Sequence, residues 1–379
     1  MVLMALDHVR DFFHAGAALF SPTDLTKTHV TLFLTRWVTH FCLPVFMFTA
    51  GIGASLWWQR GSRTKSELSR FLWTRGLWFI ALELTVMQFA YNFNFSSNVL
   101  ILLLVLWIFG ICMILMAPLI YLPIRILTVF SLAVLALENC LDPLQASQFG
   151  SAKWVWNLMH QPGVLVVGGM SVLVTYTIVP WIAVMIAGFC FGRVLGLDAA
   201  SRQRISLRLG LAMTAAFILI RAMNRYADPA AWSVHPSAIF TVLSFLNCTK
   251  YPASLDFLLM TLGPALIALA YLDRCSLERN NPLVVFGRVP LFYFILHFYV
   301  IHILAVLAAF IRYGSKAWTF VFNPLPSMGG PQQLFPAGFG YNLWVVYGVW
   351  LVVVALLYPL CRWFANLKAR RSDWWLSYL

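Results

Sequence analysis

Charged side chains are scarce in this sequence. Aspartate, glutamate, lysine and arginine make up 10% of its 379 residues, whereas hydrophobic residues make up 61%. Soluble domains carry about 25% charged residues, so a globular protein this apolar could not cover its surface with polar groups. Apolar stretches of roughly 20 residues, the length that a helix needs to cross a bilayer, recur along the chain. The composition therefore excludes an ordinary soluble protein and predicts a polytopic protein whose main partner is the lipid bilayer.

Several motifs with well-defined chemistry are also missing. The seven cysteines form no C-x-x-C pair, which argues against a zinc finger or a thioredoxin-like motif. The histidines and acids of the predicted first helix lack H-x-x-x-H or H-E-x-x-H spacing, so we predict no metal site. The absence of a G-x-x-x-x-G-K-S/T loop disfavours an ATP-driven pump. The absence of a G-x-S-x-G elbow disfavours an α/β-hydrolase.

Acidic residues are fewer than basic ones, and the formal net charge is +13. A nucleic-acid surface needs a basic stripe with interleaved aromatic residues, and no soluble segment carries one. We therefore expect no nucleic-acid partner. The basic residues are better explained as determinants of membrane orientation.

Helices are the predicted spanning elements, because strand-like alternation is absent and helices satisfy their own backbone groups in lipid. The predicted fold class is all-α: a polytopic transmembrane bundle of about ten helices that forms a single domain, 1–379. The predicted spans are residues 1–19, 32–58, 69–91, 98–117, 119–138, 172–195, 205–222, 256–272, 287–311 and 341–364. Only six residues precede Asp7, so we expect a first helix that is short or truncated, and no signal-peptide motif is present.

The basic residues fall mostly on one side of this bundle. If the N-terminus lies inside, the cytoplasmic segments hold Arg60, Arg63, Lys65, Arg70, Arg75, Arg193, Arg202, Arg204, Arg208, Arg274, Arg279, Arg288, Arg362, Lys368, Arg370 and Arg371. The positive-inside rule then places both termini of this multi-pass protein in the cytoplasm.

The loops on the opposite side are long: residues 20–31, 139–171, 223–255 and 312–340. Loops of this length are usually functional or disordered. Their Pro, Trp and Tyr content indicates packed caps over an extracytoplasmic opening. Cys140 and Cys248 both fall in these loops, so a disulfide between them is a further prediction.

Ionisable residues inside a span are functional candidates, and the first helix is dense in them. Residues 6–14 read Leu-Asp-His-Val-Arg-Asp-Phe-Phe-His. At 100° per residue, Asp7, Asp11 and His14 lie within about 60° of one another. His8 is one turn from Asp11, and a carboxylate beside an imidazole is the usual form of a general base. The alternative is a helix end at the interface, where Arg10 and Asp11 are merely solvated.

Other histidines carry two interpretations each. His40 lies one turn from Arg36, where a bundle interior would be, and Pro44 should kink the helix just beyond it. His40 could serve catalysis or be a satisfied core histidine. His29 could reach a substrate from its loop or be an exposed, inert side chain.

Two later segments add candidates. His297 and His302 are five residues apart and point in different directions, and we prefer His297 as the one that lines a site. Arg288, at the cytoplasmic entrance, could bind a cofactor phosphate or be a topology anchor.

Asn247, Lys250 and Tyr251 offer donors for a sugar or a pantetheine arm, or else form a solvated helix entry. Asp256 could pair with Lys250 or stand at the mouth of the site. Glu83 is an isolated acid in the third span, for which we expect a basic or hydroxyl partner.

Residues 6–13, together with residues 39–46, Thr-His-Phe-Cys-Leu-Pro-Val-Phe, resemble a bacterial family of membrane proteins grouped with the catalytic domain of heparan-α-glucosaminide N-acetyltransferase. Residues 245–252 and 285–302 resemble it too, so the resemblance covers essentially the whole chain. In these families an acyl group from cytoplasmic acyl-CoA moves to an acceptor on the far side of the membrane, and a histidine in the early helices is implicated.

The resemblance leaves the identity of the base open. The wider acyltransferase group carries an arginine, ten residues and then a histidine on its first helix. His8 matches that histidine, but the arginine would fall before Met1. In the animal enzyme the catalytic histidine lies between the first two helices, where His29 is the nearest match here.

The resulting hypothesis is a transmembrane acyltransferase that uses acetyl-CoA as acyl donor and a sugar or glycan as acceptor. His8 would be the base or acyl carrier, Asp11 its orienting partner and His29 a second candidate base, with His40 and His297 lining the tunnel. The alternatives are a proton-coupled secondary transporter, against which no inverted repeat is visible, and a scaffold in an envelope complex. A homo-oligomer is compatible with either enzyme or transporter.

Overall fold

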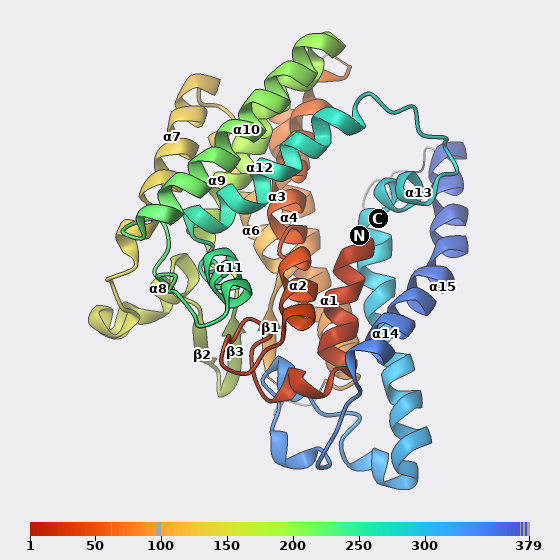
Figure 1. The fold of residues 1–379 in the computed structure, drawn as a ribbon. Coiled ribbons are helices and arrows are strands. Elements are labelled where there is room, and N and C mark those ends of the chain that lie inside the picture. The colour runs from red at the N-terminus through yellow and green to blue at the C-terminus, as the bar shows by residue number, and fades with distance from the viewer. Residues whose placement is uncertain (62, 96–99, 372, 374–375, 377–379) are drawn as a thin grey trace. The chain divides into compact units, whose positions relative to one another are not determined.

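The protein forms two compact units in a computed structural model that describes residues 1–61, 63–95, 100–371, 373 and 376 (Figure 1). The first unit comprises Met1–Thr39, Leu84–Ile101 and Leu277–Leu379, and the second comprises His40–Glu83 and Leu102–Ser276. That the chain acts as one domain stays a prediction.

The first unit is built around α1, which packs against α2, α14 and α15. Val9 and Ala5 on α1 are fully buried there, and the indole N–H of Trp350 donates to the carbonyl of Val2 at 2.9 Å. Its helices are α1 (Val2–Phe13), α2 (Val30–Thr39), α5 (Gln88–Asn92), α13 (Pro282–Arg288), α14 (Pro290–Tyr313) and α15 (Leu343–Arg370).

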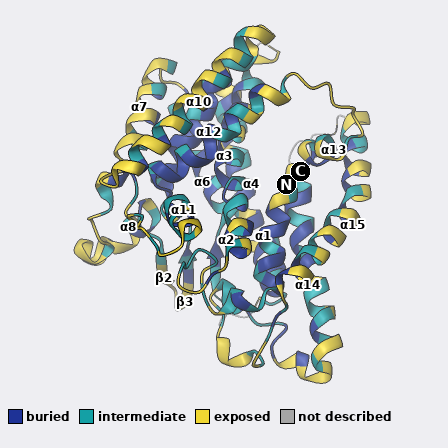
Figure 2. Ribbon diagram, in the orientation of Figure 1, coloured by how far each residue is buried: buried dark blue, intermediate teal, exposed yellow. Residues whose placement is uncertain are grey.

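In the second unit α9 packs against α3, α6 and α7, and most of its residues are buried (Figure 2). A Cβ on Gly51 of α3 would lie 2.0 Å from the carbonyl oxygen of Met185 on α9, so the two backbones touch. Its helices are α3 (Cys42–Gln59), α4 (Lys65–Leu82), α6 (Val105–Leu119), α7 (Ile124–Leu137), α8 (Lys153–Met159), α9 (Ile178–Phe191), α10 (Ala199–Met223), α11 (Ala238–Leu246) and α12 (Leu255–Leu272).

Each of the ten predicted spans contains a helix, although residues 98 and 99 of the fourth lie outside the described part. Among the described residues, seven helical segments are long and apolar enough to cross a membrane: Val30–Gln59, Ile124–Leu141, Ile178–Gly196, Ala199–Met223, Leu255–Leu272, Pro290–Thr319 and Leu343–Arg370. Val105–Leu119 is apolar but shorter. A helical, multi-pass membrane protein is therefore confirmed, whereas ten spans and cytoplasmic termini stay predictions.

A small sheet corrects the all-α prediction. In the second unit β2 (Gly163–Val167) pairs antiparallel with β3 (Met170–Val174), and β1 (Ile101–Leu103), at the unit boundary, completes the order β1-β3-β2. Gly168 and Gly169 form the hairpin turn with φ of 57° and 84°, which glycine adopts without a Cβ penalty. The hairpin occupies the end of the loop predicted over 139–171, because a Val-rich run on either side of Gly-Gly favours strands.

The second span has the kink that Pro44 predicts. α2 ends at Thr39 and α3 begins at Cys42, so the helix breaks at His40 and Phe41, before the proline. Proline has no N–H to donate to the carbonyl four residues earlier, which here belongs to His40, and its ring clashes with that carbonyl.

Glu83 is buried and binds backbone amides of the next helix, while the basic or hydroxyl partner that we expected stays a prediction. Its carboxylate accepts hydrogen bonds from the N–H groups of Leu104 at 3.3 Å, Leu106 at 2.8 Å and Trp107 at 3.2 Å. Those N–H groups belong to the first turn of α6 and have no partner within the helix. The carboxylate of Glu83 therefore caps the N-terminal end of α6.

Candidate active site

Two imidazoles meet inside the first unit. Nδ1 of His8 on α1 lies 2.6 Å from Nε2 of His297 on α14. His297 is fully buried, and His8 is half-buried with its ring centroid 4.1 Å from that of Phe298. The two histidines are 289 residues apart in the sequence, so only the packing of α1 on α14 brings them together.

The hydrogen bonds of this pair assign its protons. Nδ1 of His297 lies 3.1 Å from the carbonyl oxygen of Tyr293, which can only accept. A neutral His297 therefore carries its proton on Nδ1 and offers a lone pair on Nε2. His8 must then donate from Nδ1, which leaves the lone pair of His8 on Nε2. An imidazole held in this way is oriented to take a proton on Nε2.

A cluster of two acids and two arginines adjoins the pair on α1 and α2. Arg10 donates to Asp7 at 3.0 Å and to Asp11 at 2.7 Å, and Arg36 donates to the other oxygen of Asp7. The side chain of Arg10 is 4% exposed. Arg10 is therefore buried and paired, so the alternative of a solvated helix end does not describe it. The pairing of Asp11 with His8 stays a prediction.

The other candidates of the first unit have local partners. His29 is exposed, and its Nδ1 accepts from the N–H of Leu32 at 3.3 Å, which caps α2. His302 lies 2.8 Å from the carbonyl of Ala90 and therefore faces a different partner from His297. Arg288 is half-buried at the last residue of α13, and its role as a phosphate ligand stays a prediction.

The remaining candidates belong to the second unit. His40 is buried, with its ring against that of Phe257. The ammonium of Lys250 lies 5.2 Å from the ring centroid of Tyr251, and the hydroxyl of Tyr251 lies 3.4 Å from that of Tyr176. Asn247 ends α11, and its carbonyl accepts from an arginine of α10.

Asp256 pairs with that arginine, Arg221, rather than with Lys250. A guanidinium nitrogen of Arg221 lies 3.8 Å from carboxylate oxygens of both Asp256 and Asp228. Asp228 in turn accepts from the hydroxyls of Thr249 and Ser254. This network holds the loop after α11 in place.

The predicted disulfide is not formed, because Cys140 and Cys248 are free thiols. The sulfur of Cys140 lies 3.5 Å from the hydroxyl of Tyr226. Burial raises the pKa of the Cys248 thiol well above its usual value. Cys248 is thus protonated and unreactive at neutral pH.

The comparison with known proteins now decides the family. Residues 4–227 match the family described as heparan-alpha-glucosaminide N-acetyltransferase, catalytic. The chain belongs to this family. No curated protein and no solved structure matches the chain.

The heparan-alpha-glucosaminide N-acetyltransferase family is a family of transmembrane acetyltransferases. The matched residues include His8, Asp11, His29 and His40 but end before His297. The resemblance noted in the sequence is therefore confirmed at the level of the family.

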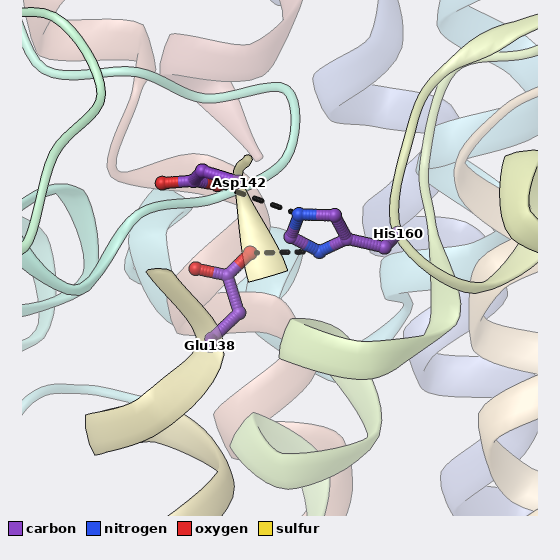
Figure 3. Close-up of side chains that lie close together, drawn as sticks. All are labelled: Glu138, Asp142 and His160. Carbon is purple, nitrogen blue, oxygen red and sulfur yellow. Dashed lines mark ion pairs between the residues drawn. The ribbon is translucent and has the colours of Figure 1, made fainter. Parts of the chain in front are cut away.

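This acetyltransferase family member has a second group of titratable residues that its sequence did not reveal. Glu138, Asp142 and His160 lie together in the second unit (Figure 3). Asp142 and His160 also line a pocket of about 300 Å³ with Leu144, Gln145, Gln161, Pro162, Pro229, Thr249, Tyr251 and Pro252. The Glu-x-x-x-Asp spacing puts both acids on one side of a helical turn, and this was the signal available, although nothing in the sequence linked them to His160.

Proposed function

We propose that the chain is an acyltransferase of the bacterial inner membrane that moves an acetyl group from cytoplasmic acetyl-CoA to an extracytoplasmic sugar or glycan. The family supports acetyl transfer. The observation that carries the proposal is the hydrogen bond between His8 and His297. It orients an imidazole whose Nε2 is the basic nitrogen, as transfer from a thioester to a hydroxyl or amine requires.

In the proposed reaction a hydroxyl or amino group of the acceptor gives its proton to Nε2 of His8. The acceptor atom attacks the thioester carbonyl carbon, the new C–O or C–N bond forms and the C–S bond breaks. His8 then returns the proton to the thiolate of coenzyme A. Throughout the reaction, Nδ1–H of His8 donates its hydrogen bond to Nε2 of His297. This hydrogen bond disperses the positive charge of the transient imidazolium.

The same geometry serves an acyl carrier. Nε2 of His8 attacks the thioester carbonyl carbon, the C–S bond breaks, coenzyme A leaves as its thiolate, and an acyl-imidazolium that keeps its Nδ1–H remains. Attack by the hydroxyl or amine of the acceptor then breaks the C–N bond and regenerates the imidazole, and the proton that the acceptor releases goes to the thiolate. Both versions need the lone pair on Nε2, and they differ in whether label stays on the protein when no acceptor is present.

Roles for the other candidates follow from the same proposal. Asp11 and His40 would support the reaction, His29 is the second candidate base, and Arg288 would bind a phosphate of coenzyme A. Asn247, Lys250 and Tyr251 would donate to the acceptor sugar or to the pantetheine arm.

The experiment measures transfer of radiolabelled acetyl from acetyl-CoA to glucosamine by the full chain in proteoliposomes. Glucosamine is the probe because the name of the family denotes a glucosaminide acceptor. We expect His8→Ala to lose about 10²- to 10⁴-fold in rate, the usual contribution of a positioned acid–base group. His235→Ala, which changes a histidine that contacts Ser233, is the matched control and should keep the wild-type rate.

Two outcomes would redirect the proposal. Unchanged transfer by folded His8→Ala, with loss in His29→Ala, would move the base to His29. Accumulation of glucosamine inside the vesicles without acetyl-CoA would favour the secondary transporter.

A further inference from the structure

Glu138, Asp142 and His160 form a compact group outside the proposed acyl-transfer centre. Glu138 begins the 3₁₀ turn Glu138–Leu141 that continues α7, Asp142 follows that turn, and His160 ends α8. Nδ1 of His160 lies 3.4 Å from Glu138 and Nε2 lies 3.4 Å from Asp142. Figure 3 shows one carboxyl group facing each ring nitrogen of His160.

The group lacks the hydrogen bonds that buried polar atoms normally make. The side chain of Glu138 is 1% exposed and that of His160 is 3% exposed. Neither carboxylate oxygen of Glu138 nor Nδ1 of His160 has a hydrogen-bond partner among the described residues. Asp142 accepts a hydrogen bond from the side-chain amide of Asn139 at 2.9 Å. Buried polar groups are almost always satisfied, so this deficit indicates that something else binds here.

The charge of the group points to a cation. With both carboxyl groups ionised and the imidazole neutral, the group carries a charge of −2. Arg221, which belongs to the same unit, is already shared between Asp228 and Asp256. A divalent ion would neutralise the pair of acids and satisfy the atoms that lack hydrogen bonds.

We propose that Glu138, Asp142 and His160 bind one divalent transition-metal ion, for which zinc is the best fit. One imidazole and two carboxylates are a ligand set that zinc accepts, with a fourth position left for water or a substrate oxygen. Calcium and magnesium prefer oxygen ligands throughout, so they should bind less tightly.

The spacing of the ligands suits this ion after a small closure. One ligand atom from each residue lies within 4.8 Å of the others. Bonds of about 2.0–2.2 Å place tetrahedral ligands about 3.4 Å apart. One carboxylate must therefore move inward by about 1 Å, and Asp142, which is 19% exposed, is freer to move than Glu138.

The pocket gives the site a function. Asp142 and His160 form part of the wall of the 300 Å³ pocket that Thr249 and Tyr251 also line. An ion at this wall would face the pocket with its open position, where it could bind a hydroxyl or carboxylate oxygen of a ligand. The inference does not depend on the proposed acyl transfer, because the metal site stands on the second unit alone.

The test uses the full chain, purified in detergent, stripped with a chelator and titrated with zinc by calorimetry. We expect one zinc ion per chain and a rise in Tm when zinc is added, because an ion that binds the folded state stabilises it. Removing a residue that only holds a metal ligand in place weakens metal binding by about 10- to 100-fold. Glu138→Gln and His160→Asn remove the ligands themselves, so each should weaken zinc binding by more than that. Cobalt in place of zinc should give visible absorption bands that both variants lose.

His235→Asn is the matched control and should bind zinc as the wild type does. Glu138→Gln is nearly isosteric, so it keeps the test decisive if His160→Asn does not fold. Failure of the folded wild type to bind zinc or cobalt would overturn the proposal. Equal binding by wild type and Glu138→Gln would overturn it too, because the ion would then sit elsewhere.

Discussion

At the scale of single residues, the proposed chemistry depends on the proton that His297 carries. Tyr293 fixes that proton on Nδ1 because its carbonyl can only accept. His297 thereby takes the place that a carboxylate has in many histidine bases: it accepts from Nδ1–H of His8. Unlike a carboxylate, His297 is neutral, and burying a neutral group costs less free energy than burying a charged one.

His297 is therefore a positioning residue. Its replacements should differ in kcat according to whether the new side chain can accept a hydrogen bond from His8. We expect His297→Leu to lower kcat by about 10- to 100-fold, because His8 loses its acceptor, while KM for acetyl-CoA changes little. His297→Gln can accept through its amide oxygen and should restore most of kcat. The measurement is steady-state acetyl transfer. Equal losses in the two folded variants would mean that His297 only fills space.

The acid–arginine cluster makes a second residue-scale prediction. Asp7 is 9% exposed and binds both Arg10 and Arg36, so Asp7→Asn removes the charge that pairs with both guanidinium groups. Breaking a buried pair costs about 3–5 kcal/mol, and we expect a clear fall in Tm. Asp24→Asn, in an exposed turn, is the control and should leave Tm unchanged; a similar Tm for both variants would contradict the structural role.

At the scale of elements, the apolar stretches of the sequence were sufficient to place the long helices, because each predicted span contains a helix. Local departures were harder to predict. The break at His40 follows from a missing donor at Pro44, and the hairpin follows from Val-rich strands around Gly-Gly. Glu83 could not be assigned, because its partners belong to a helix that begins about 20 residues later.

The crossing of α3 with α9 yields an element-scale prediction with an internal control. A Cβ on Gly51 would lie 2.0 Å from the carbonyl oxygen of Met185, whereas a Cβ on Gly53 of the same helix meets nothing within 4 Å. Gly51→Ala must push the helices apart and should destabilise the unit by about 1–3 kcal/mol. Gly53→Ala should be neutral or slightly stabilising, because alanine favours helix.

Thermal unfolding of both variants in detergent checks this. If Gly51→Ala unfolds at the same temperature as Gly53→Ala, the two helices do not touch at Gly51.

At the scale of the whole molecule, the predicted site residues divide between the two units. His8, Asp11, His29, Arg288 and His297 belong to the first unit, and His40, Asn247, Lys250 and Tyr251 belong to the second. The sequence could identify these residues as polar groups among apolar ones. It could not pair His8 with His297 or Glu138 with His160, because such pairs depend on how distant helices pack.

Membrane orientation is the whole-molecule property that the charge distribution predicts. Cys140 and Cys275 are both exposed thiols. The positive-inside rule places Cys140 outside, on the loop over 139–171, and Cys275 inside, beside Arg274 and Arg279. The other five cysteines are buried or half-buried, so the two exposed thiols report the two sides.

A membrane-impermeant maleimide added to right-side-out vesicles should label Cys140 and leave Cys275 unmodified until the vesicles are opened. Cys140→Ser should abolish the first signal, and Cys275→Ser the second. Labelling of Cys275 in sealed vesicles, with Cys140 protected, would invert the topology. It would then place the pocket of Tyr251 and the group of Glu138, Asp142 and His160 on the cytoplasmic side, where acetyl-CoA rather than an envelope sugar would be the molecule at hand.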